Sequence, residues 1–167
     1  MSLRRPLVAL LWLAPFAARA LAGDGPAPAA LPPVVGATEV FQLDEPTGLA
    51  LGGFDPVSYF LPEGPRPGRA DLELLWSGAA WRFASAANRA AFKADPASFA
   101  PRLGGSDTEA LSRGRIASSH PLRYAVVEKR LYLFRTDAGR SRFLEDRTLA
   151  AAVEEHWPVL RAGLVQP

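Results

Sequence analysis

Trp81-Arg-Phe-Ala-Ser85-Ala-Ala-Asn-Arg-Ala-Ala-Phe92-Lys-Ala-Asp95-Pro96-Ala-Ser-Phe99 decides the fold of this 167-residue chain, because the stretch passes from a strand pattern into a helical one. Ser85 stands where the helical pattern begins, and its hydroxyl is suited to accept a hydrogen bond from a first-turn amide. Asp95-Pro96 ends this helix and begins another, since proline disfavours helix in the preceding residue but fits a first turn. The second helix is expected to stop near Gly104-Gly105.

Short strands are predicted around this stretch, where branched and aromatic residues cluster between glycine-rich or proline-rich breaks. The turn Ser77-Gly78 joins two of them, and the segment 61–71 is expected to be an exposed loop because its prolines and glycines cannot hold regular structure. The expected strands are 38–43, 72–76 and 80–84.

The second half of the chain predicts one further strand pair and more helices. A tight polar turn at 128–130 separates the strands 124–127 and 131–134. Helical patterns cover 107–113, 137–147 and 149–160. The fold class is therefore α+β, a small antiparallel or mixed sheet with helices packed mainly on one face. We find no internal repeat in the sequence.

The amino terminus predicts export. Arg4 and Arg5 precede an apolar run of about 12 residues and a small-residue cleavage site near Ala22, which is typical of a signal peptide over residues 1–22. The run is shorter than the roughly 20 residues that a membrane-spanning helix needs, so we expect no membrane anchor. General secretion and twin-arginine export are both open routes. A flexible tether rich in proline and alanine follows over 23–35, and a single domain over 36–167. We expect the protein to be periplasmic or secreted.

Composition narrows the classes of partner and cofactor. The formal charge is +2, and loss of the three arginines of the signal peptide leaves −1, so no nucleic-acid partner is expected. The chain has no cysteine, so it has no disulfide or thiolate site. We expect no cofactor, and a small ligand or a partner protein as the binding partner.

Several motifs in order resemble the YHS domain. They are Asp55-Pro56-Val57, then Gly78-x-x-Trp81-x-Phe83-x-Ser85, and then Phe92, Pro96 and Phe99. The resemblance covers roughly residues 48 to 160 and implies a secreted or periplasmic member of that family. Members with a metal role place cysteines where this chain has Ser58, Ala84 and Asn88. The resemblance therefore does not carry the metal site across, since soft metal ions prefer sulfur.

Four residues are candidates for ligand binding: Asp55, Tyr59, Trp81 and Asp107. Each also has a structural interpretation. Asp55 precedes a proline and is suited to accept backbone hydrogen bonds in a turn, and Asp107 is suited to cap a helix. Tyr59 and Trp81 carry polar tips and belong to the motif, so one of them is a candidate to line a groove, while most aromatic residues must form the core.

Two histidines are candidate metal ligands, although their spacing matches no ligand motif. His120 precedes a proline in a predicted loop, and His156 stands beside Trp157 in the last predicted helix. We recognise no catalytic motif. The leading hypothesis is a non-enzymatic YHS-like binding module with an unknown ligand. The alternatives are a metal- or haem-handling protein using histidine, carboxylate or tyrosine ligands, and a hydrolase without a recognisable motif.

Overall fold

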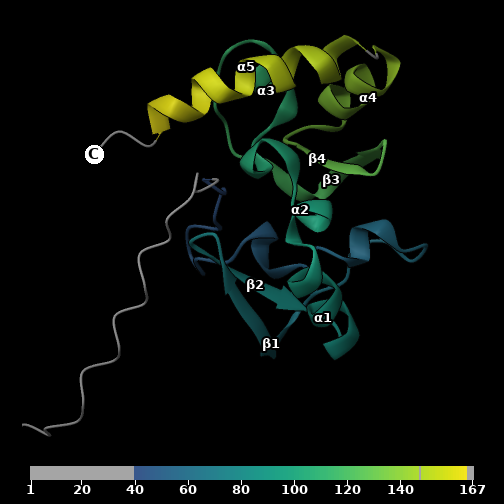
Figure 1. The fold of residues 1–167 in the computed structure, drawn as a ribbon. Helices are drawn as coiled ribbons and strands as arrows, with labels where there is room; N and C mark the ends of the chain where they lie inside the picture. Colours follow the sequence, from purple (N-terminus) through teal and green to yellow (C-terminus); the bar gives the residue numbers. More distant parts are fainter. Residues whose placement is uncertain (1–39, 147, 165–167) are drawn as a thin grey trace, which may run out of the picture. The chain divides into compact units, whose positions relative to one another are not determined.

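The computed structural model describes residues 40–146 and 148–164, and Figure 1 labels their helices and strands. The α+β class is confirmed, but the strands form two separate antiparallel sheets of two strands each and not a single sheet. The predicted signal peptide and tether lie outside the described residues.

The first hairpin joins β1 (Arg69–Trp76) to β2 (Ala79–Phe83), with Leu74 opposite Trp81. Ser77 and Gly78 form the predicted turn, and both have positive φ angles, 50° and 76°, as a tight hairpin of right-handed twist requires. Helix α1 (Ala86–Ala94) follows at once. The Ser85 hydroxyl accepts a hydrogen bond from the Asn88 amide at 3.1 Å, which confirms the predicted cap.

The second hairpin joins β3 (His120–Val127) to β4 (Arg130–Phe134) through Glu128 and Lys129. Helix α4 (Asp137–Glu145) follows, and the Thr136 hydroxyl caps it by accepting from the Gly139 amide at 3.0 Å. The remaining elements are η1 (Leu51–Gly53), η2 (Ser58–Phe60), α2 (Pro96–Phe99), η3 (Arg102–Gly105), α3 (Thr108–Ser112) and α5 (Thr148–Leu164).

Two hydrophobic clusters form the core, and β4 contributes to both of them. Its alternate residues Leu131 and Leu133 belong to the cluster around Trp81 and Phe92. Tyr132 and Phe134 point the other way into the cluster that α4 and α5 cover. A strand that is buried on both faces needs a continuous apolar run, and Leu131-Tyr-Leu-Phe134 supplies it.

An internal repeat, which we did not detect in the sequence, is evident in the structure. Leu51-Gly-Gly-Phe-Asp55 recurs 52 residues later as Leu103-Gly-Gly-Ser-Asp107. In both copies the leucine and both glycines have positive φ, between 54° and 82°. The hydrogen bond from residue four of the motif to the leucine carbonyl measures 3.1 Å in each. A hairpin, a hydroxyl-capped helix and a buried phenylalanine follow both turns, with Phe143 standing 51 residues after Phe92.

Several predicted boundaries were wrong. The helix expected to stop near Gly104-Gly105 ends at Phe99, because Ala100 precedes Pro101 and has an extended backbone. Residues 40–43 form no strand: the Gln42 amide donates to Gly104 O, and Leu43 makes only an isolated antiparallel bridge with Ala50. Strand β1 begins at Arg69, inside the segment expected to be a loop. The turn between β3 and β4 has two residues, so Arg130 already belongs to β4.

Candidate functional site

Asp55 is completely buried, and its carboxylate is saturated by protein donors. Its Oδ1 accepts from the Val57 amide at 2.9 Å. Its Oδ2 accepts from the Ala84 amide at 2.9 Å and from the Asn88 side-chain amide at 2.6 Å. The turn-residue interpretation therefore describes Asp55 well, and this residue also fixes the first glycine turn to the start of α1.

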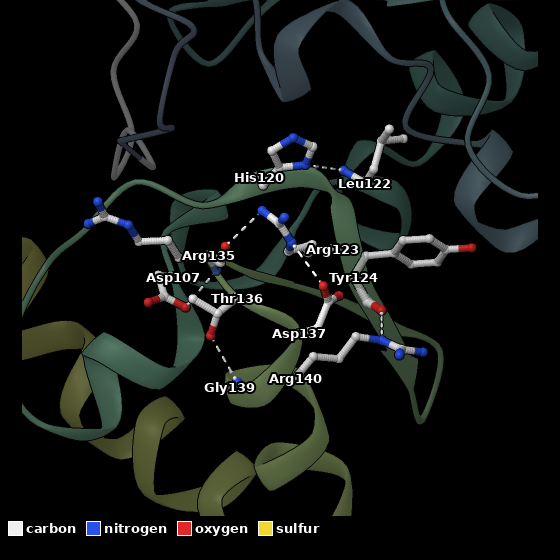
Figure 2. Close-up of polar contacts among 10 residues, drawn as sticks. All are labelled: Asp107, His120, Leu122, Arg123, Tyr124, Arg135, Thr136, Asp137, Gly139 and Arg140. Atoms are coloured by element: carbon white, nitrogen blue, oxygen red, sulfur yellow. Dashed lines mark hydrogen bonds and ion pairs between the residues drawn. The ribbon is translucent and has the colours of Figure 1, made fainter.

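Asp107 has the equivalent structural role in the second repeat. It is 5% exposed, and its Oδ1 accepts from the Arg135 amide at 3.0 Å, as Figure 2 shows. The predicted helix cap was wrong in this respect: Asp107 occupies the position before α3, but its side chain makes no cap hydrogen bond. Ala84 and Arg135 each lie directly before the capping residue of a helix, so the two aspartates serve equivalent amides in separate hairpins.

Tyr59 is 3% exposed and belongs mainly to the core. Its hydroxyl donates to Pro121 O at 3.0 Å, and its ring meets Tyr124 edge to face at 5.1 Å. Burial raises the pKa of Tyr59, so the phenol stays protonated at neutral pH. The residue also contributes to the wall of a shallow apolar hollow with Phe60 and Phe99.

Trp81 is fully buried, which places it in the core. Its indole Nε1 donates to Trp76 O at 3.0 Å, and its ring lies 5.0 Å from Phe41 and 5.1 Å from Phe92. Trp81 nevertheless contributes to the wall of a cavity, described below. Asp55, Tyr59 and Asp107 do not line that cavity.

The two histidines lie on different elements and both are exposed. His120 begins β3, and its Nδ1 accepts from the Leu122 amide at 3.2 Å (Figure 2). His156 lies on α5. Within residues 40–146 and 148–164, no group of three or more histidine, cysteine, aspartate or glutamate side chains is arranged to hold a metal ion.

The candidate site is a cavity of about 350 Å³ where the two repeats meet, which we call the junction cavity. Both glycine turns border it, through Leu51-Gly52 from the first and Gly105 from the second. The strap, which we define as residues 41–46, forms another side of it, and Ser118 and Ser119 add hydroxyl groups. Among these residues, only Trp81 was predicted from the sequence to be a candidate for ligand binding. No spacing pattern in the sequence connects the strap to the second glycine turn.

Glycine is required where the strap crosses the second turn. The Gly104 carbonyl accepts the Gln42 amide at 2.8 Å. A Cβ on Gly104 would collide with the carbonyl oxygen of Val40 and would press on the ring of Trp157. Because the φ of Gly104 is also +60°, only glycine allows the strap to lie this close.

The charges on the cavity wall have one sign. The charged residues that line it are Asp44 and Glu45, both in the strap. The Asp44 carboxylate accepts the Thr47 hydroxyl at 2.6 Å. Ser119 donates its hydroxyl to Gly105 O at 2.7 Å, whereas Ser118 is exposed.

Among the described residues, no helix combines the length and the apolar content that crossing a lipid bilayer requires. Comparison with protein-family models, with curated proteins and with solved structures finds no match to this chain. The resemblance to the YHS domain therefore stays a prediction from the sequence motifs.

Proposed function

We propose that this chain is an exported YHS-like binding module that holds a small organic ligand in the junction cavity. The observation that carries the proposal is the cavity itself. Its volume of about 350 Å³ lies within the range of roughly 300–1,000 Å³ that small-molecule sites occupy. Apolar and polar groups both line it, which gives a ligand surface to pack against and groups to hydrogen-bond to.

The wall chemistry favours a neutral or cationic ligand with an apolar part. Leu43, which is 41% exposed, supplies apolar surface, and Gln42 and Ser118 supply groups that can hydrogen-bond to a ligand. Asp44, with its neighbour Glu45, makes the potential in the cavity negative, which attracts cations and repels anions.

Three probes that share one ring system test this proposal. Tryptamine is cationic, indole is neutral and indole-3-acetate is anionic at pH 7, and isothermal titration calorimetry measures the affinity of each. We expect tryptamine to bind most tightly and indole-3-acetate most weakly. The variant Ser118→Trp fills the cavity and should abolish binding, whereas the control Ser141→Trp, an exposed position on α4, should leave it unchanged. Equal binding by both variants, or no binding of any probe, would refute the site.

Export is the second part of the proposal and has its own test. The features that support it are Arg4-Arg5, the apolar run and the small residues near Ala22. Amino-terminal sequencing of protein recovered from the periplasm or medium of an expressing bacterium should find a mature chain that begins close to Gly23. Protein that keeps residues 1–22 and remains in the cytoplasm would contradict export without affecting the cavity.

A further inference from the structure

Strand β3 has one free edge, because in the described structure it pairs with β4 alone. The two-residue turn makes Val127 and Arg130 a hydrogen-bonded pair, so the backbone groups of residues 125 and 127 point toward β4. The groups of Tyr124 and Val126 must then point away from β4. The contact of Tyr124 agrees with this, since its carbonyl accepts from Arg140 Nε of helix α4 at 2.6 Å (Figure 2).

A groove of about 390 Å³ runs between this edge and α4, and we call it the β3–α4 groove. Seven large apolar side chains are exposed in the described part of the chain, and three of them line this groove. They are Leu122 (52% exposed) and Val126 (39%) from β3, and Leu144 (42%) from α4. Apolar side chains on both walls beside a free backbone edge match the way extended segments add to a sheet.

The charge in and beside the groove is positive. Arg140 and Asp137 line the groove, and Arg123 lies beside it. Arg123 pairs with Asp137 at 3.3 Å. Among residues 40–146 and 148–164, Arg140 forms no ion pair, so its charge is left for a carboxylate from elsewhere.

We propose that the β3–α4 groove binds an extended segment of a partner protein that carries alternating apolar side chains and an acidic end. The segment adds to the free edge of β3 and exchanges hydrogen bonds with the backbone of Val126. A backbone amide of the bound segment donates to the Tyr124 carbonyl in place of Arg140 Nε. Arg140 is then free to form an ion pair with the acidic end of the segment. Main-chain hydrogen bonds provide affinity, and Leu122, Val126 and Leu144 select apolar side chains. This interaction is separate from ligand binding in the junction cavity.

Two fluorescent peptides of about eight residues, the length of a common strand, test the proposal. Both alternate valine with threonine, and one ends in two aspartates while the other ends in two lysines. Fluorescence anisotropy should show at least about tenfold tighter binding of the aspartate peptide, a difference of about 1.4 kcal/mol. Leu144→Asp should abolish this binding, and Leu75→Asp, at an exposed leucine of β1, serves as the matched control and should not. Arg140→Glu should reverse the preference between the two peptides.

Amide hydrogen exchange locates the contact. Adding the aspartate peptide should slow exchange of the Val126 amide, while amides of β1 should not change. The proposal fails if the peptide does not bind, if Leu144→Asp binds as well as the parent, or if Val126 exchange does not respond. It also fails if light scattering finds a dimer that Leu144→Asp dissociates, because the occupant of the groove would then be a second copy of this chain.

Discussion

Replacing Asp55 by asparagine should cost much more stability than the same change at Asp107, although the two residues occupy equivalent positions in the repeat. The carboxylate of Asp55 accepts three donors with its two oxygens. An asparagine offers one oxygen and one amide. Its best orientation keeps the oxygen toward Ala84 and Asn88 and turns the amide against the Val57 N–H, which is then buried without an acceptor.

The magnitude follows from these contacts. An unsatisfied buried amide costs about 1–3 kcal/mol, and the two hydrogen bonds that remain lose the strengthening of a charged acceptor. We therefore expect Asp55→Asn to lose about 3 kcal/mol, which lowers the melting temperature by roughly 10 °C for a domain of this size. Asp107→Asn can keep its oxygen against the Arg135 amide, so its expected loss is below about 1 kcal/mol.

Urea denaturation followed by tryptophan fluorescence and by circular dichroism measures both losses. The exposed pair of Arg69 and Asp71 supplies a control, since Asp71→Asn should leave stability nearly unchanged. Losses of the same size for Asp55→Asn and Asp107→Asn would refute the reasoning. A loss below about 1 kcal/mol for Asp55→Asn would refute it as well, because the number of satisfied donors would then not decide stability here.

Three further changes have expected outcomes that the same denaturation measures. Trp81→Ala should lose about 3–5 kcal/mol because the indole is fully buried, and a loss below about 1 kcal/mol would contradict its place in the core. Tyr59→Phe should lose about 1 kcal/mol at pH 7 with its bond to Pro121 O. Because burial raises the pKa of Tyr59, the stability that depends on its protonated form is complete below pH about 10 and is lost as the pH rises further. The stability of Tyr59→Phe should therefore fall less steeply in alkali than that of the parent protein. An equal fall in both proteins would contradict this role of Tyr59. Burial alone would raise the pKa of Glu154, but the hydrogen bond and charge of Arg102 outweigh it and lower that pKa. The stability that Glu154 contributes is therefore present above pH about 4.3 and lost as the pH falls. Glu154→Gln should lower the free energy of unfolding by under about 1 kcal/mol at pH 7 and should not lower it in strong acid. A loss of stability that persists in acid would show that the charge of Glu154 is not involved.

Local chemistry explains which elements could be predicted from the sequence. Ser77-Gly78 sets the first turn, and Ser85 caps the helix that follows it. The turn and the cap each depend on four residues or fewer, so both can be predicted from the sequence without knowledge of tertiary contacts. The boundaries of β2 and α1 accordingly lie within one or two residues of those predicted.

Non-local contacts explain what could not be predicted. The branched and aromatic residues Val40 and Phe41 predict a strand over 38–43, but the Gln42 amide donates to the carbonyl of Gly104, which lies 62 residues away. Leu51 and Leu103 both adopt positive φ, a conformation that leucine rarely takes and that no sequence pattern indicates. The junction cavity lies between these segments, so it could not be predicted either.

The repeat also explains what the two candidate carboxylates do. The sequence makes Asp55 and Asp107 candidates for ligand binding, yet each accepts the amide of a residue that joins a strand to a helix, 29 and 28 positions away. These shared hydrogen bonds serve the fold. The repeats also differ, and the second repeat places Leu144 at the position of Lys93 in the first. That single difference makes one wall of the β3–α4 groove apolar, so restoring the first repeat's residue with Leu144→Lys should remove peptide binding and leave the fold intact.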